Sequence, residues 1–139
     1  KTAIVASDGI LIPAKPDYLS TLGIDYLRSS LQRLVADYNE FATLGGESGN
    51  TIAPVLIGVV FTMVQEYGGQ PIAAVRPFMD QTRRLGVPVF SAYIKENKTM
   101  FADAPQYGMP VVLSDYSTGT HRSVVHGLEA VATEFLAKL

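Results

Sequence analysis

The chain has 139 residues, of which 47% are apolar and 17% charged, and its formal net charge is −2. The apolar content predicts one folded unit over residues 1–139, and the charge balance excludes nucleic-acid binding through the overall field of the protein. Cysteine is absent, which excludes disulfides and thiolate chemistry. With two histidines we predict no metal site. No apolar run predicts a membrane span, so we expect no membrane partner.

The first part of the chain reads as a strand followed by a helix. Gly9–Pro13 is a short apolar run that ends on proline, which is typical of a strand in a parallel sheet. Asp17 and Ser20 are candidate helix caps. A stripe of apolar residues at helical spacing follows them: Leu27, Leu31, Leu34, Val35 and Tyr38. This helix should end before the glycine-rich stretch Leu44–Asn50.

The middle of the chain holds the strongest strand pattern. Ile52–Val64 is long, β-branched and apolar at successive positions, which predicts a central strand buried on both faces. Gly68 and Gly69 predict a turn. Helical spacing then runs from Ile72 to Leu85, with Gly86 as the residue that ends the helix.

The last part of the chain predicts a further strand and two helices. Val87–Ile94 is the strand, and the polar turn Lys95–Lys98 leads from it to a short helix at Met100–Ala104. Val111–Leu113 predicts a fourth strand or an extended segment, and a final helix should begin near Ser117–Thr120. Strands alternating with helices predict an α/β fold of three layers, with a mostly parallel sheet and flanking helices.

Motifs that carry enzyme chemistry are absent from this sequence. It contains neither the G-x-x-x-x-G-K-[ST] nor the G-x-G-x-x-G phosphate-binding pattern, and no zinc-protease or nucleophile-elbow motif. The glycine-rich stretch Leu44–Gly49 has the spacing of neither phosphate loop. Composition and spacing alone therefore assign no catalytic residue.

Three segments carry a family resemblance. Asp8–Leu27 is a strand that ends on proline and continues through P-x-x-x-S-x-x-G into a helix. Leu56–Met63 is an apolar strand, and Gly86–Leu113 is close to the pattern G-x-x-V-F-x-T-x-I … (E/D)-A-P-x-x-G-x-P-V. In this order they resemble the second half of ParA/MinD-type deviant Walker P-loop ATPases, in the Soj-like partition branch.

The resemblance implies a partial P-loop NTPase fold of the SIMIBI type that lacks its Walker A half. The family's Walker A and Walker B residues would lie upstream of Lys1, so the chain would be the C-terminal part of a larger ATPase domain. We therefore expect no ATP hydrolysis by the chain alone. ATP and Mg²⁺ are cofactors of the full-length family, and neither is expected to bind tightly to this chain by itself.

The family also implies partners and a location. Its members partition plasmid or chromosomal DNA in the bacterial cytoplasm, on the nucleoid. They form homodimers, bind DNA nonspecifically and work with a ParB-like partner protein. By resemblance, this chain would supply adenine-side, dimer and DNA-binding surfaces.

Individual residues follow from the same resemblance. The positions that match the family's nucleotide-binding segments are Pro13, Thr62, Met63, Ile94, Lys95 and Glu96. The positions that match its DNA-contacting turn and helix start are Lys95, Lys98 and Arg122. Contact with phosphate requires only positive charge and reach, which these three side chains have.

Two other functions stay open. The chain could be a non-catalytic α/β binding or interaction module that keeps the fold without the ATPase activity. It could also belong to a MinD-like positioning ATPase, whose branch binds membranes through a basic amphipathic C-terminal helix. The segment Glu134–Leu139 lacks a repeated basic face, so we rank membrane binding low.

Overall fold

The computed structural model describes residues 2–45, 50–114 and 118–139, apart from the side chains of residues 103, 105 and 107. Its elements follow in this order: α1 (Thr2–Val5), β1 (Gly9–Ala14), α2 (Tyr18–Leu44), β2 (Val55–Val64), β3 (Glu66–Tyr67), β4 (Gln70–Pro71), α3 (Arg76–Arg84), β5 (Val89–Lys95), α4 (Lys98–Tyr107), the 3₁₀ turn η2 (Val111–Leu113) and α5 (Gly119–Leu136).

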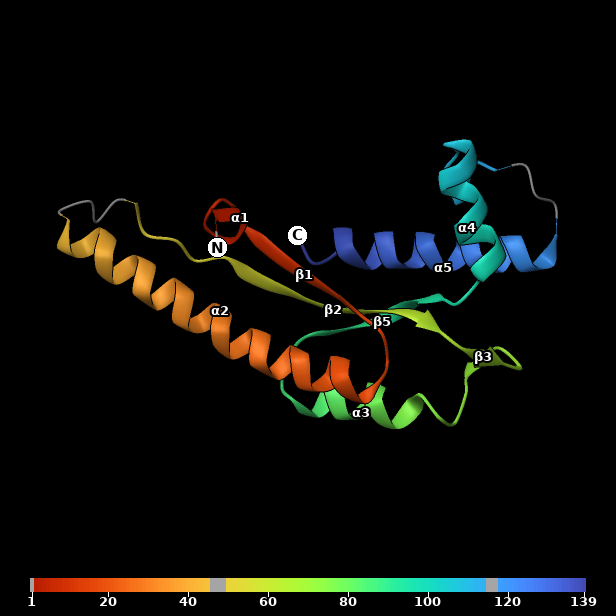
Figure 1. Cartoon of the computed structure of the whole chain (residues 1–139), viewed down its shortest axis with the longest axis horizontal. Coiled ribbons are helices and arrows are strands. Elements are labelled where there is room, and N and C mark those ends of the chain that lie inside the picture. Colours follow the sequence, from red (N-terminus) through yellow and green to blue (C-terminus); the bar gives the residue numbers. More distant parts are fainter. Residues whose placement is uncertain (1, 46–49, 115–117) are drawn as a thin grey trace.

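The main sheet has three parallel strands in the order β1-β2-β5. Parallel neighbours need a crossover, and α2 and α3 supply the two crossovers. Both crossovers run in the same direction across the sheet, so both helices lie on one face, while α4 and α5 lie on the other (Figure 1). The predicted α/β fold of three layers with a parallel sheet is confirmed.

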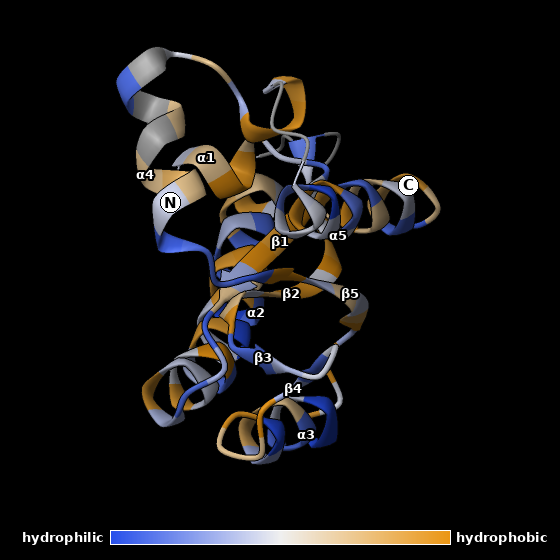
Figure 2. Ribbon diagram, turned by 90° about the vertical axis from the view of Figure 1, so that its right-hand side faces the viewer, coloured by the Kyte–Doolittle hydropathy of each residue, from blue (hydrophilic) through white to orange (hydrophobic). Residues whose placement is uncertain are grey.

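The central position of β2 is confirmed, and its burial is confirmed for Gly58–Phe61 and Val64, whereas Val55 and Met63 are exposed. Val59, Phe61 and Val64 are at most 1% exposed. One core cluster joins Val59 to Ile24 of α2, and a second joins Phe61 and Val64 to Met79 of α3. Figure 2 shows the apolar strands β1 and β2 between the helices. β2 thus anchors the packing of both crossover helices.

A bulge interrupts the pairing of β1 with β2. Ile10 is in register with Leu56 and Leu11 with Gly58, so Ile57 is an extra residue on β2. Gly58 has φ +152°, and a Cβ there would lie 3.1 Å from the Phe90 ring. Only glycine fits this backbone without strain.

The start of α2 is confirmed, whereas the predicted inner face is shifted. The Asp17 carboxylate accepts a hydrogen bond from the Ser20 amide at 2.8 Å, and this bond lowers the pKa of Asp17. Leu27 is 37% exposed. The buried residues of the helix are Thr21, Ile24 and Leu31. The stripe predicted from spacing was therefore centred to one side of the real contact face.

β2 begins at Val55, so the prediction of a strand from Ile52 is wrong at its start. The Asn39 side chain of α2 holds both backbone groups of Ile52, accepting from its amide at 2.7 Å and donating to its carbonyl at 2.9 Å. The amide and carbonyl of Ile52 are therefore not available for hydrogen bonds to a neighbouring strand. Residues 46–49 of the predicted loop lie outside the described residues.

The helix predicted from Ile72 begins only at Arg76. The amide of Ile72 donates to the carbonyl of Gln65 at 3.0 Å, which closes the small β3–β4 hairpin around the predicted glycine turn. Pro77 then lies in the first helical turn, where a missing amide costs little. Gly86 has φ +73° after the helix end, as predicted.

The helix predicted at Met100–Ala104 is longer at both ends. Asn97 caps α4 by accepting from the Met100 amide at 3.0 Å, and Gly108 ends it with φ +63°. Pro105 lies within α4, where it supplies no backbone amide donor.

The fourth strand predicted at Val111–Leu113 is wrong. The amide of Leu113 donates to the carbonyl of Pro110 at 2.9 Å, so the segment closes on itself as a 3₁₀ turn. α5 begins at Gly119, capped by the Thr118 hydroxyl, which agrees with the predicted start. Ser117, the first residue of the predicted range, lies outside the described residues.

We expect Gly58→Ala to lower the free energy of unfolding by about 2 kcal/mol or more, because the new Cβ meets the Phe90 ring at a strained φ. Urea unfolding measures the change. The matched control is Gly23→Ala on α2, where nothing lies within 4 Å of the added Cβ; it should stabilise the protein by about 0.5–1 kcal/mol. An equal response of the two variants would contradict the bulge.

Candidate functional site

The carboxyl ends of β2 and β5 lie side by side. Val64 is in register with Lys95, and the Glu96 amide donates to the Val64 carbonyl at 2.9 Å. A cavity of about 390 Å³ opens beside these ends and the first turn of α4. Its lining residues are Thr62, Met63, Ile94, Lys95, Glu96, Asn97, Lys98 and Phe101. Ligands of open parallel sheets bind at this edge.

The structure brings five of the six residues predicted on the nucleotide side into this wall. The sixth, Pro13, lies on β1 in register with Val60. Because β2 separates β1 from β5, Pro13 does not reach the cavity.

Met63 has an unusual backbone conformation. Its φ is +53°, the one positive value among the described non-glycine residues. The β2–β5 register shifts between Phe61 and Val64, so Met63 lies at a bulge. A left-handed non-glycine residue costs about 1–3 kcal/mol, and such residues cluster at functional sites. The Met63 side chain is 54% exposed at the cavity.

Lys95 is engaged in a polar network behind the cavity. Its ammonium lies 2.6 Å from the Glu66 carboxylate and donates to the Ser123 hydroxyl of α5 at 2.7 Å. The side chains of Lys95 and Glu66 are 25% and 14% exposed, so solvent screens this pair only partly. Much of the charge of Lys95 is therefore compensated within the chain.

Tyr93 completes this network. Its hydroxyl donates to the other Glu66 oxygen at 2.5 Å. Partial burial, together with the hydrogen bond and the negative charge of Glu66, raises the pKa of Tyr93 to about 12. The phenol therefore stays a donor at neutral pH and holds Glu66 in place.

Lys98 and Arg122 differ from Lys95. Both are exposed, in the first turns of α4 and α5, and neither forms a salt bridge with another described residue. Arg122 precedes Ser123, which Lys95 contacts, so α5 begins close to the cavity wall. The positive ends of the two helix dipoles add to these charges.

Sequence reasoning gave no binding role to four residues of this region: Glu66, Tyr93, Ser123 and Phe101. Tyr93 and Lys95 are two apart on a strand, which places both on one face and could have indicated the pair. Ser123 and Phe101 come from helices that follow β5, and only the packing of these helices places them here.

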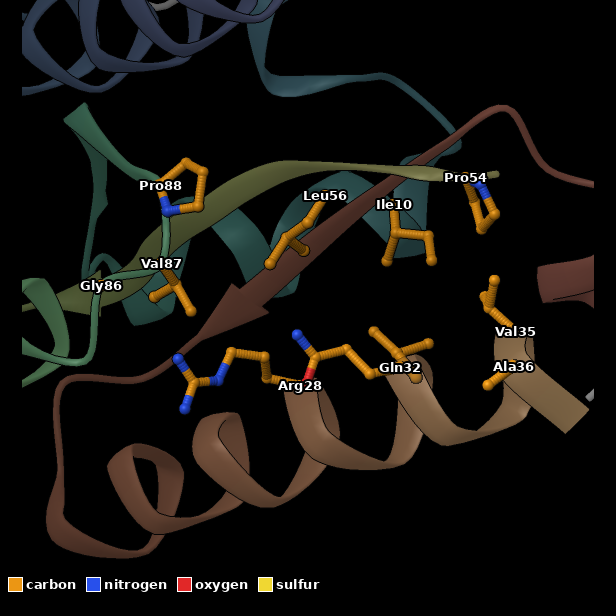
Figure 3. A pocket seen from close by; sticks show the side chains of 11 residues that line it. Ile10, Arg28, Gln32, Val35, Ala36, Pro54, Leu56, Gly86, Val87 and Pro88 are labelled. Atoms are coloured by element: carbon orange, nitrogen blue, oxygen red, sulfur yellow. The ribbon is translucent and has the colours of Figure 1, made fainter. Parts of the chain in front are cut away.

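A second cavity of about 510 Å³ lies between α2 and the sheet (Figure 3). Its wall is mostly aliphatic, with Arg28 at one end. The Arg28 guanidinium donates to the Leu85 carbonyl and to Asp25, both at 2.9 Å, while its Nε has no partner among the described residues. No residue predicted for nucleotide or DNA lines this cavity. We assign it to imperfect packing beneath α2.

Within the described part of the chain, no three side chains of His, Asp or Glu lie together as metal ligands. None of the described helices has the length and apolar character needed to cross a bilayer.

The raised pKa of Tyr93 is testable by ultraviolet titration. The difference between the wild type and Tyr93→Phe should show one phenol ionising near pH 12. The folded value lies above the unfolded value of about 10, so the stabilisation is complete below pH 10 and is lost as the pH rises through 12. Tyr67→Phe, at a side chain that is 87% exposed, is the control. A Tyr93 component near pH 10 would contradict the network.

Comparison with known proteins supports the fold. No protein-family model and no curated protein matches the sequence. Among solved structures, apo McdA from Cyanothece matches with a TM-score of 0.63 and 18% identity. The match covers 92% of this chain and 46% of McdA, so the chain spans just under half the length of that protein. The chain therefore shares the α/β fold of the matching part of McdA.

Proposed function

We propose that this chain is the C-terminal part of a ParA-like ATPase that partitions DNA, and that it supplies the adenine side of the nucleotide site. The observation that carries the proposal is the strained bulge at Met63, which opens on a cavity at the ends of two parallel strands. The likeness to McdA, itself a ParA/MinD-like ATPase, supports the same family.

The open edge of β1 supports a larger domain. β1 pairs with β2 alone, so its other edge has no strand partner among the described residues. Leu11 is 36% exposed on this strand. An unpaired edge of six residues is a template for a further strand. In the proposed whole protein, a strand of the Walker A half would pair there.

The chemistry of the cavity suits a base better than a phosphate. Met63, Ile94 and Phe101 offer apolar surface for a flat ring, while Asn97 and backbone groups offer hydrogen bonds. The sequence has no phosphate-binding loop. The residues present therefore do not form a site for ATP phosphates or Mg²⁺, and we assign no step of hydrolysis to them.

We expect adenosine to bind this cavity weakly. In an amide-resolved NMR titration, millimolar adenosine should shift the resonances of Met63, Ile94 and Phe101 and leave those of α2 unchanged. Cytidine, whose ring is smaller, is the ligand control. Shifts distributed over the whole chain, or none at saturating adenosine, would contradict the adenine-side assignment.

Met63→Gly separates strain from function. Glycine adopts φ +53° freely, so the variant should gain about 1 kcal/mol in the free energy of unfolding, measured in urea. The same variant loses the exposed thioether and should bind adenosine more weakly. If the variant were less stable and bound adenosine equally well, the strain at Met63 would have no role in binding.

We further propose that Lys98 and Arg122 contact DNA phosphates. In salt titrations with random duplex, Lys98→Ala and Arg122→Ala should each lower the salt slope by about one unit, equally for all sequences. Lys95→Ala should have a smaller effect, because Glu66 already compensates its charge. Lys138→Ala, two residues beyond the C-terminal end of α5, is the control. Unchanged slopes for both proposed contacts would place the DNA site elsewhere.

A further inference from the structure

The cavity beneath α2 lies at the opposite end of the sheet from the proposed nucleotide site. It opens near the amino ends of β2 and β5, at Leu56 and Pro88, whereas the nucleotide cavity lies at the carboxyl ends of the same strands. Its volume of about 510 Å³ falls in the range of small-molecule sites, about 300–1,000 Å³. No described residue lines both cavities, so a ligand beneath α2 would occupy a separate site.

The wall of this cavity is aliphatic. Ile10 and Leu56 point from the sheet toward α2, and Val35 points back from the helix (Figure 3). All three residues stay only half-buried, although they lie between two packed elements. No described aromatic residue lines the cavity, which follows α2 from Arg28 to Ala36, about 12 Å along the helix axis. This shape and this chemistry suit an extended hydrocarbon tail.

Arg28 closes one end of the cavity with an unused hydrogen-bond donor. Its guanidinium donates from one terminal nitrogen to the Leu85 carbonyl and from the other to Asp25, both at 2.9 Å. The Nε atom is buried and has no partner among the described residues. A buried donor without an acceptor destabilises a protein, so this end of the cavity favours a ligand that brings an oxygen.

The charge at this end selects an anion. Asp25 compensates Arg28 only in part, because their side chains are 52% and 37% exposed and solvent screens the pair. A carboxylate at Nε would add a charge-assisted hydrogen bond, which is stronger than a bond to a neutral oxygen. Gln32, one helical turn from Arg28 on the same wall, offers a further donor. The end beside Arg28 therefore suits a carboxylate head.

We propose that the cavity beneath α2 binds an aliphatic carboxylate of medium chain length. The carboxylate would lie at Arg28 Nε, and the tail would extend between Leu31 and Leu56 toward Pro54. Incomplete packing of α2 on the sheet creates the space, and the ligand would supply the contacts that the side chains leave unmade. The proposal goes beyond the nucleotide and DNA surfaces and does not depend on them.

Chain length tests the apolar wall. In an amide-resolved NMR titration, octanoate should shift the resonances of Leu31, Val35 and Leu56. Those of Met63 and Ile94, on the nucleotide cavity, should stay unchanged. From butanoate to octanoate, each added methylene should tighten binding about fourfold, the effect of burying one methylene. A dissociation constant above about 10 mM for octanoate, or shifts confined to the nucleotide cavity, would overturn the proposal.

Arg28→Met tests the anionic end. Methionine keeps an apolar stem and removes the guanidinium, so octanoate should bind about tenfold more weakly while octanol binds as before. Arg33→Met, at an exposed arginine of α2 outside the cavity wall, is the matched control and should change neither affinity. If Arg28→Met left octanoate binding intact, or weakened both ligands equally, the carboxylate would not lie at Arg28.

Val35→Phe tests the space itself. The larger side chain should fill the cavity and weaken octanoate about tenfold or more, because it takes the place of several methylenes. Leu34→Phe, at the neighbouring position that does not line the cavity, is the control. Circular dichroism checks that each variant is folded. Undiminished octanoate binding by folded Val35→Phe would overturn the proposal. None of these results bears on adenosine binding, so the two proposals fail separately.

Discussion

The rest of the structure depends on the burial of the central strand β2 between its neighbouring strands and helices. The strand is paired on both edges and covered on both faces, so its backbone can deviate only where the neighbours leave room. It does so twice, at Gly58 beneath the Phe90 ring and at Met63 where the strand ends. The first deviation is accommodated by the absence of a side chain. The second is strained, and it shapes the wall of the cavity.

The two edge strands of the sheet differ in how well the backbone groups on their outer edges are covered. α5 covers the outer edge of β5: Gly127 allows an approach so close that a Cβ would lie 3.3 Å from the Tyr93 carbonyl. The Glu134 carboxylate accepts from the amides of Ser91 and Ala92 at 2.9–3.0 Å. Those amides are thereby unavailable to another strand, whereas the edge of β1 has no such cover among the described residues. A further strand could therefore add to the sheet at the edge of β1 but not at the edge of β5.

α2 packs incompletely against the sheet on its inner face and carries exposed apolar side chains on its outer face. Near its start it packs on the sheet through Ile24, and near its end Asn39 fastens it to the segment before β2. Between these attachments a cavity remains under Arg28. Twenty-seven residues are more than the three-stranded sheet can cover, so part of the helix surface remains uncovered by the sheet.

The sequence by itself determined the class of the fold, the parallel sheet and the central place of β2. Local patterns suffice there, because a long apolar run must be buried on both faces and alternating elements require crossovers. The family resemblance of the sequence also pointed to five residues that line the cavity, and these residues meet because they lie at the ends of adjacent parallel strands.

Only the tertiary structure decided the rest. The compensation of Lys95 by Glu66 joins residues from two strand ends that no local pattern relates. Ile52 lies outside the ladder because the Asn39 side chain binds its backbone groups, a contact that local propensity cannot predict. Val111–Leu113 forms a 3₁₀ turn and pairs with no strand among the described residues, which local propensity cannot predict either. The inner face of α2 also depends on its tilt, so spacing alone identified an apolar stripe but not the side that meets the sheet.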